Sequence, residues 1–253
     1  AADVIVMGGT LGGSGTLEAG SYQLSGGTVS VSLIGTGSLI LSGSATVSGN
    51  NSGYNGPVSI VSGSVTLNGT NPLGSGEIAL SGGSLLNLGT DGMTLANRVQ
   101  LGTGGGGASV PSGQSGTMSG GITNRSGTNT FIKEGAGTLS VSGKVGLGAR
   151  GGDATNSYVG LNASNGVLRF AGSPKFIGNA IVNTDSRLLL DGVEVNTWGS
   201  LISGSGDVAI TNQVSLKNLG GNATFSNPVF VNSGARLISS NGFSNATSYI
   251  LFN

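Results

Sequence analysis

The chain contains no cysteine and no histidine among its 253 residues. Without cysteine it has no disulfide, no thiolate nucleophile and no zinc–thiolate site. Without histidine it has neither the usual catalytic triad nor the imidazole ligand found in many metal sites. These absences exclude several common classes of enzyme and metalloprotein. We therefore expect a protein that is not an enzyme, with no catalytic residue, cofactor or metal.

Charge is scarce as well. Ten basic and ten acidic residues make up 8% of the chain and give a formal net charge of zero, whereas roughly 25% of the residues in ordinary soluble domains are charged. A neutral chain gives no electrostatic reason to expect nucleic acid as a partner. No apolar run approaches the roughly 18 residues that a membrane-spanning helix requires. We expect no transmembrane segment in this chain.

Glycine is abundant, at 51 residues, while proline numbers only five. Glycine has no three-residue period, which excludes collagen. Instead Gly, Ser and Asn interrupt short runs that alternate apolar and small polar residues, the period of strands with one buried face. No apolar stripe of helical period is present, so we expect essentially no helix. The clearest strand-like runs are Thr28–Leu33, Ser38–Leu41, Val58–Val61, Ser64–Leu67, Glu77–Leu80, Ser84–Leu88, Thr138–Val141, Val167–Phe170, Arg187–Leu190, Asp207–Ile210 and Val229–Val231.

Short strands ended by Gly or Asn are typical of a β-solenoid, because its corners need residues that tolerate positive φ. At roughly 20 residues per coil, the sequence predicts an all-β, right-handed parallel β-solenoid (β-helix) of about 12 coils. We expect one domain over residues 1–253. Two segments break the pattern, a Gly/Ser-rich one over residues 102–121 and a polar one over residues 146–160. We predict that both are loops outside the rod.

A short motif recurs in the chain. Gly35–Gly43 reads Gly-x-Gly followed by alternating apolar residues, and Gly135–Gly143 repeats it. A degenerate third copy occupies Gly204–Ile210. The motif predicts a turn followed by a half-buried strand.

The first copy continues into a longer pattern. After Gly35–Gly43 come Asn51, Tyr54 and Gly56, and the pattern closes with Leu73–Leu85, which contains Leu-Gly-x-Gly and a Gly-Gly step. In order and spacing this stretch resembles the passenger-associated transport repeat of autotransporter passenger domains, also called the autotransporter-associated β-strand repeat. The similarity extends over about half the chain. It departs from the family pattern at Pro57, and the second copy lacks the Tyr-x-Gly step.

The resemblance implies a β-solenoid that is exported across the outer membrane and is extracellular or on the bacterial cell surface. It does not imply one particular activity. We favour a non-catalytic structural or adhesive surface protein, such as a passenger stalk or an adhesin segment. One alternative is a self-assembling subunit of an extracellular fibre or sheath, stacked end to end. A second alternative is a carbohydrate-active enzyme on the same fold. Expected partners are further copies of the chain, surface glycans, or a host or neighbouring cell surface.

The densest group of charged residues lies in one stretch of the second half. Enzymes that cleave polysaccharides use paired carboxylates beside basic residues, and Asp185, Asp191 and Glu194 would supply such a pair if they stacked on adjacent coils. We interpret the group instead as a solvated face with weak ion pairs. Its members are Arg169, Lys175, Asp185, Arg187, Asp191 and Glu194.

Other candidate features favour structural roles. Gly151-Gly152-Asp153 is a fragment of a calcium-binding pattern, and we interpret Asp153 as a turn residue. Residues 102–121 lack the Lys and the helix of a phosphate-binding loop. Trp198 and most phenylalanines follow residue 160, which favours core filling over a sugar-stacking surface.

Charge is uneven along the chain. Residues 1–97 carry four charged residues, all acidic, whereas residues 98–253 carry ten basic and six acidic ones. In a solenoid this gives an acidic N-terminal half and a basic C-terminal half, which favours head-to-tail contact between subunits. We predict that the two terminal strands pair between subunits. The residues of this predicted contact are Val4, Ile5, Val6, Tyr249, Ile250, Leu251 and Phe252.

Overall fold

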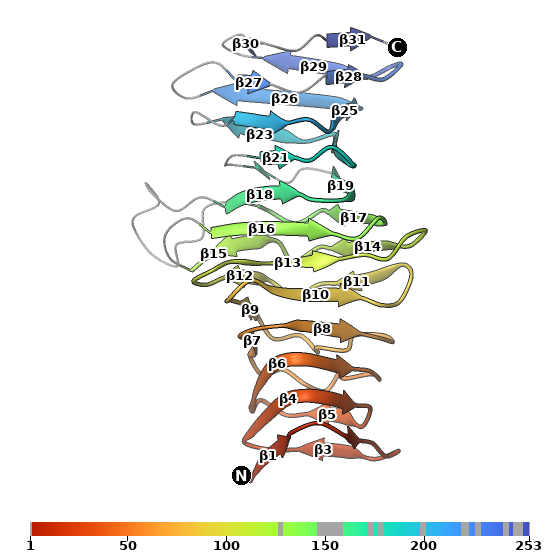
Figure 1. Cartoon of the computed structure of the whole chain (residues 1–253), viewed down its shortest axis with the longest axis vertical. Coiled ribbons are helices and arrows are strands. Elements are labelled where there is room, and N and C mark those ends of the chain that lie inside the picture. Colours follow the sequence, from red (N-terminus) through yellow and green to blue (C-terminus); the bar gives the residue numbers. More distant parts are fainter. Residues whose placement is uncertain are drawn as a thin grey trace.

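The computed structural model describes residues 2–125, 129–145, 159–171, 175–176, 180–197, 201–218, 223–225, 229–239, 243–244 and 250–252. The described residues form strands and no helix. Strands of successive coils pair in parallel. They stack as a β-solenoid that rises from the N-terminus to the C-terminus (Figure 1). The predicted all-β solenoid is confirmed.

Ladder A, the longest stack, receives one strand from each coil. Eleven parallel pairings join its twelve strands. At about 4.8 Å per strand, the stack is on the order of 50 Å long. In stacking order the strands are β2 (Thr10–Leu11), β4 (Ser21–Val29), β6 (Ser38–Val47), β8 (Ser64–Leu67), β10 (Ser84–Leu88), β13 (Gly106–Ser109), β16 (Asn129–Glu134), β18 (Val159–Ala163), β21 (Ala180–Val182), β24 (Leu201–Gly204), β27 (Ala223–Phe225) and β30 (Phe243–Ser244).

Ladder B follows ladder A in the order of the coil and forms a separate sheet. In the first two coils this place is taken by β3 (Thr16–Glu18) and β5 (Ser32–Ile34), which pair with each other. Ladder B consists of β11 (Met93–Leu95), β14 (Ser115–Met118), β17 (Thr138–Val141), β19 (Gly166–Ala171), β22 (Ser186–Asp191), β25 (Asp207–Thr211), β28 (Val229–Val231) and β31 (Ile250–Phe252).

Ladder C precedes ladder A in each coil. The first parts of β4 and β6 belong to it, because these long strands continue around the corner into ladder A. Its other strands are β1 (Asp3–Val6), β7 (Val58–Ile60), β9 (Ile78–Leu80), β12 (Val99–Leu101) and β15 (Ile122–Asn124). In the last coils the same place in the coil order is held by β20 (Lys175–Phe176), β23 (Glu194–Thr197), β26 (Gln213–Asn218) and β29 (Arg236–Ser239).

About nine turns are complete, in the sense that a strand occupies all three places of the coil. The sequence predicted about 12 coils. The difference arises because three levels of ladder A, those of β6, β8 and β18, close through turns or through isolated bridges such as Gly35–Tyr54 and Ile122–Val145.

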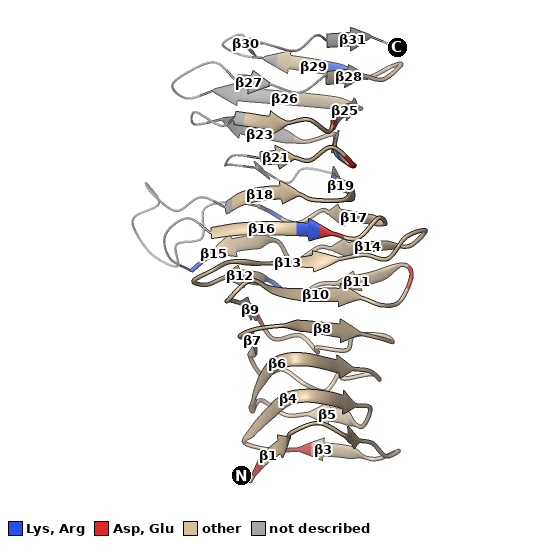
Figure 2. Ribbon diagram, in the orientation of Figure 1, with Lys and Arg blue, Asp and Glu red and all other residues tan. Residues whose placement is uncertain are grey.

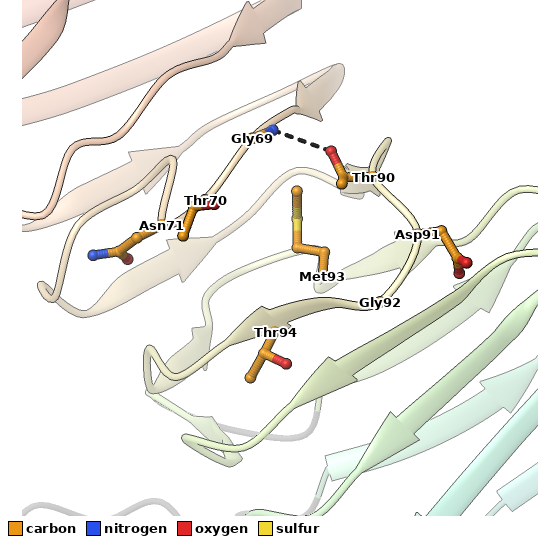
Figure 3. A pocket seen from close by; sticks show the side chains of 8 residues that line it. All are labelled: Gly69, Thr70, Asn71, Thr90, Asp91, Gly92, Met93 and Thr94. Atoms are coloured by element: carbon orange, nitrogen blue, oxygen red, sulfur yellow. Dashed lines mark hydrogen bonds between the residues drawn. The ribbon is translucent and has the colours of Figure 1, made fainter.

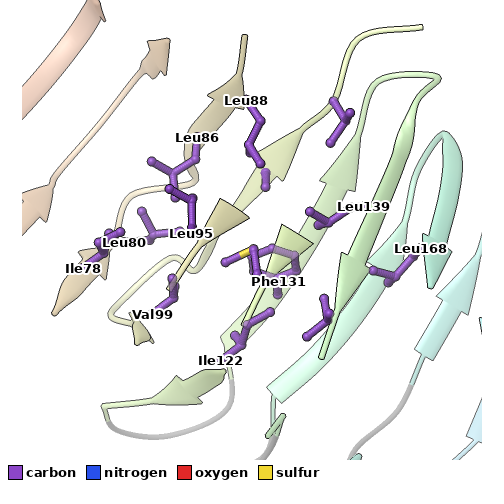
Figure 4. Close-up of a cluster of buried hydrophobic side chains, with 14 of the residues drawn as sticks. Ile78, Leu80, Leu86, Leu88, Leu95, Val99, Ile122, Phe131, Leu139 and Leu168 are labelled. Carbon is purple, nitrogen blue, oxygen red and sulfur yellow. The ribbon is translucent and has the colours of Figure 1, made fainter. Parts of the chain in front are cut away.

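The core is a continuous apolar column inside the coils. In ladder C, Leu41, Ile60, Leu80 and Leu101 lie in register on successive coils and are fully buried. Figure 4 shows how side chains of several coils interdigitate in the middle of the rod. Each fully buried Leu or Ile contributes about 1.5–3 kcal/mol. The alternation seen in the sequence therefore marks inward-facing positions, and β10 coincides with the predicted run Ser84–Leu88.

The prediction of a loop over residues 102–121 is wrong, because these residues contain β13 and β14 within the rod. The glycines are there because neighbouring coils approach closely. A Cβ on Gly106 would lie 2.7 Å from Cβ of Leu80, and one on Gly107 would lie 2.0 Å from the carbonyl oxygen of Ile132. Of the second predicted loop, residues 146–158 lie outside the described residues, while residues 159–160 begin β18.

The recurring Gly-x-Gly motif marks a corner, as predicted. Its three copies lead directly into β6, β17 and β25, whose first residues alternate between partly exposed and buried positions in β6 and β17. However, the copies do not share one place in the coil. β6 runs through ladders C and A, whereas β17 and β25 belong to ladder B.

Candidate functional site

The predicted contact at the N-terminal end lies on β1. Ile5 faces outward and is 62% exposed, while Val4 and Val6 are half-buried. Val4, Val6 and Leu11 pack against the core, yet their register partners one coil later, Tyr22, Leu24 and Val29, are almost fully buried. The apolar column is therefore only partly covered in the first coil.

The predicted contact at the other end lies on β31, which comprises Ile250, Leu251 and Phe252 and pairs with β28. Tyr249 lies outside the described residues. The two termini are at opposite ends of the rod (Figure 1). Within one molecule β1 and β31 are therefore far apart, so the predicted pairing requires two molecules.

The charged group divides into separate ion pairs. Nε of Arg169 donates to Oδ2 of Asp191 at 3.0 Å, and Asn212 donates to Oδ1 of the same carboxylate. Burial by itself would raise the pKa of Asp191, but the hydrogen bonds from Arg169 and Asn212 and the charge of Arg169 hold it below its ordinary value. The other pair, Arg187 with Asp207 at 2.9 Å, is more exposed. Both pairs link adjacent strands of ladder B.

The stacking on adjacent coils that a carboxylate pair of Asp185 and Asp191 would require is not found. Both belong to one coil, where Asp185 precedes β22 and Asp191 is its last residue. About 20 Å separates the two ends of such a strand, too far for a catalytic carboxylate pair. The backbone of Glu194, in β23, pairs in register with that of Lys175, in β20. The sequence missed this arrangement because it does not show where one coil ends.

Two further predictions fall partly or wholly outside the described residues. Asp153 and Trp198 both lie there. Among the aromatic residues after position 160, Phe170 is fully buried in β19, in agreement with core filling.

Lys133, in β16, is a buried cation that sequence reasoning did not single out. Its side chain is fully buried, and Nζ donates to the carbonyl oxygens of Gly137 at 2.6 Å and Asn165 at 2.7 Å, and also to that of Gly135. Its register partners are Ala108 and Ala163, whose small side chains leave room for the lysine stem. Three ammonium protons thus meet three carbonyl oxygens. The signal in the sequence is a lysine at an inward-facing position of a strand in which apolar and polar residues alternate.

A pocket of about 310 Å³ opens beside β11, between two successive turns of the chain. Residues 69–71 form one wall, and residues 90–94 form the other and the floor (Figure 3). Thr70 and Thr90 lie on either side of the Met93 side chain, and the backbone amide of Gly69 donates to Oγ1 of Thr90 at 3.0 Å. This hydrogen bond ties the two walls together.

The edge of the pocket carries a negative charge. The backbone amide and the hydroxyl of Ser115 donate to Oδ1 of Asp91 at 2.8 and 3.1 Å. Both hydrogen bonds lower the pKa of Asp91, and the bond from the backbone amide has the larger effect. The carboxylate is therefore ionised at neutral pH, and no Lys or Arg lines the pocket. The sequence shows only two glycine-containing turns, Asn68-Gly69 and Asp91-Gly92, and cannot show that they face each other.

The described residues contain no group of three or more Asp or Glu side chains that could hold a metal ion. They also contain no helix long and apolar enough to cross a membrane.

Comparisons of the chain with protein-family models, with curated proteins and with solved structures find no match.

Proposed function

We propose that this chain is a non-catalytic structural and adhesive surface protein, exported across the outer membrane and displayed as a rod outside the cell. The observation that carries the proposal is ladder A. Its twelve strands stack without interruption over a continuous apolar core, so the rod extends by one strand spacing with each coil. A shape of this kind holds its two ends apart and presents turns along its sides.

The composition of the outer surface supports a role outside the cell. No charged residue occurs in the ladder A strands from β2 to β13, which are uniformly tan in Figure 2. Their outward positions carry Ser, Thr and Asn, as in the register series Thr28, Thr46, Thr66 and Asn87. The chain also lacks cysteine. The resemblance of Leu39–Leu85 to autotransporter passenger repeats also supports a role outside the cell.

The location is tested on intact cells of the producing organism. Proteinase K is added to the cells, and an antibody raised against the purified chain follows its digestion. We expect loss of the band on intact cells, while a cytoplasmic enzyme remains undigested. Full protection on intact cells, with digestion only after lysis, would overturn the proposal.

The partly covered core at β1 favours a second candidate, a subunit that stacks end to end. The inward side chains Val4, Val6 and Leu11 are only half-buried in the isolated chain, and the carboxylates of Asp3 and Glu18 are exposed in the same coil. Arg236, in β29 near the opposite end, is exposed and basic. Because β1 is in ladder C and β31 is in ladder B, their backbone pairing requires one subunit to be turned about the rod axis relative to the next. Such stacking would bury the apolar residues, and the charges would set the polarity.

Negative-stain electron microscopy at high protein concentration tests this candidate. Stacking predicts filaments, which deletion of residues 248–253 shortens or abolishes. Isolated rods on the order of 50 Å long, or filaments that the deletion leaves unchanged, would exclude pairing through β31 and leave the surface rod.

A further inference from the structure

The apolar core of the rod is open at both ends. Among the residues that the structure describes, six hydrophobic side chains pack against the core but are only partly buried. All six lie in or directly beside strands of the first and last coils, which have a neighbouring coil on one side only. A further coil at either end would bury them. They are Val4, Val6, Leu11, Leu17, Ala235 and Leu237.

The first and last coils match strand for strand. Both run through the three places of the coil in the same order, as β1, β2 and β3 in the first coil and β29, β30 and β31 in the last. The strands have four, two and three residues in each coil. In both coils the second strand begins seven residues after the first. The last coil of one molecule can therefore be followed by the first coil of another.

The six end strands each have one edge without a partner in the described structure. β1, β2 and β3 pair only with strands of the second coil, and β29, β30 and β31 pair only with strands of the preceding coil. The backbone N–H and C=O groups of such edges can template pairing with another chain. Repeat proteins normally cover their ends with a polar capping repeat. The open core at both ends of this rod shows no such cap.

The inward-facing positions of β1 and β29 coincide when the two strands are aligned from their first residues. Val4 then lies opposite Leu237. Both face the core, because their register partners within the chain, Tyr22 and Val214, are fully buried. Stacking in this alignment continues the apolar column from one molecule into the next.

The outward-facing positions coincide in the same alignment. Ile5 lies opposite Ile238, and both follow an inward residue on the outer face of their strands. Ile5 is 62% exposed and Ile238 is partly exposed in the single chain. Contact between them covers an apolar side chain that no residue of its own molecule covers.

Charge is complementary at the same two coils (Figure 2). Asp3 and Glu18 are the only charged residues before Glu77, and Arg236 is the only one after Lys217. Asp3 and Arg236 are both exposed, and Arg236 forms no salt bridge with another described residue. The alignment of β1 with β29 places these two side chains directly opposite each other. Opposite charges at the two ends favour head-to-tail contact and disfavour contact between like ends.

We propose that the last coil of one molecule pairs with the first coil of the next, β29 with β1, β30 with β2 and β31 with β3, and that Arg236 forms an ion pair with Asp3 across this contact. The inference rests on the candidate function of end-to-end stacking and supplies its register. Each place of the coil then continues as the same place in the next molecule, whereas pairing of β1 with β31 joins strands from different places.

Engineered disulfides test the register, since the chain has no cysteine of its own. The double variant Ile5→Cys/Ile238→Cys places two thiols on neighbouring strands about 4.8 Å apart, a separation that a disulfide spans. We expect covalent multimers on non-reducing gels after incubation with oxidised glutathione. The matched control is Ile5→Cys/Ser215→Cys, because Ser215 is the register partner of Ile238 one coil further from the contact. It should give no such multimers.

Charge variants test the ion pair. Asp3→Lys and Arg236→Glu each place like charges opposite one another and should weaken association about two- to fivefold at low salt. The double variant reverses the pair and should associate like the wild type. Glu77→Lys, at an exposed acidic residue away from both ends, is the control and should leave association unchanged. Analytical ultracentrifugation measures association, and circular dichroism checks that each variant is folded.

The outcomes separate this inference from the functions on which it builds. A chain that stays monomeric at high concentration would overturn both the register and the candidate function of stacking. Multimers from Ile5→Cys/Leu251→Cys, with none from Ile5→Cys/Ile238→Cys, would indicate pairing of β1 with β31 and overturn the register alone. Failure of the double charge variant to restore association would overturn the ion pair. None of these results depends on the protease test of location.

Discussion

The N-terminal coils and the coil that contains Lys133 satisfy their buried corner carbonyls in different ways. In the N-terminal coils the buried groups are neutral. The hydroxyl of Tyr22 donates to the carbonyl oxygen of Leu17 at 2.8 Å, and that of Tyr54 donates to the carbonyl oxygen of Gly37 at 2.7 Å. The two rings also pack edge to face, with centroids 6.0 Å apart.

In the coil that contains Lys133, the ammonium group of this lysine takes the place of the tyrosine hydroxyls. The coils are also longer there. Register partners are 17 residues apart between Leu24 and Leu41, but 25 residues apart between Ala108 and Lys133. Lys133 reaches three carbonyl oxygens, two on its own coil and that of Asn165 after β18. In the longer coil one side chain with three donors serves three carbonyl oxygens, whereas each tyrosine of the N-terminal coils has a single proton to donate.

The largest effect is expected for Lys133→Met, which keeps the length of the side chain but removes its donors. Three buried carbonyl oxygens would lose their partner, so we expect a loss of about 3 kcal/mol in the free energy of unfolding. Urea denaturation followed by circular dichroism at neutral pH measures it. Glu134→Gln, at the neighbouring outward position, is the control and should change stability little. A Lys133→Met protein as stable as the wild type would show that the ammonium is not needed at this corner.

The second prediction concerns pH. Burial lowers the pKa of Lys133 to about 8, below its unfolded value of about 10.5. Between these values the unfolded chain binds more protons than the folded chain, so stability rises with pH across this window. The gain relative to Lys133→Met should be at most about 3 kcal/mol, because the three carbonyl acceptors favour the charged form. A flat difference between pH 7.5 and 10.5 would indicate that the acceptors cancel the effect of burial.

Removing a tyrosine hydroxyl from a corner of the N-terminal coils should destabilise the rod less than removing the Lys133 ammonium. Tyr54→Phe removes the hydroxyl that serves Gly37 and Pro57, at a cost of about 1–2 kcal/mol. Burial raises the pKa of Tyr54, so this tyrosine should resist ionisation in an alkaline absorbance titration of the folded chain. If Tyr54→Phe destabilised the rod as much as Lys133→Met, the distinction between the two kinds of corner would be lost.

The smallest effects concern the ion pairs of ladder B. Asp191→Asn should lower stability by about 1 kcal/mol at neutral pH, because Asp191 is mostly buried but its partner Arg169 is 40% exposed. Asp207→Asn, in the more exposed pair, should change it by less than about 0.5 kcal/mol. The lowered pKa of Asp191 means that its contribution exists above about pH 4 and disappears as the pH falls further. Thermal melts of both variants at neutral and acidic pH check this order.

The sequence predicted the fold well because alternation and corner glycines are local signals. Runs such as Ser84–Leu88 and Val229–Val231 coincide with strands. It failed at residues 102–121, since glycine also occurs where a strand must pass close to its neighbours, as at Gly107 under Ile132. The pocket and the site of Lys133 could not be predicted from such local signals. Both depend on which residues of successive coils face each other, and this register is set by coil lengths that vary along the chain.

The position of the two termini has a mechanical consequence. Because they lie at opposite ends of the rod (Figure 1), a force that pulls them apart acts along the axis and loads the outermost coil first. Each coil contacts mainly the coils next to it, so the coils would detach one after another. A coil of about 20 residues adds only about 4.8 Å to the rod but releases about 70 Å of extended chain. A tether built in this way lengthens stepwise under load and dissipates work at each step, while the coils that remain stacked stay folded.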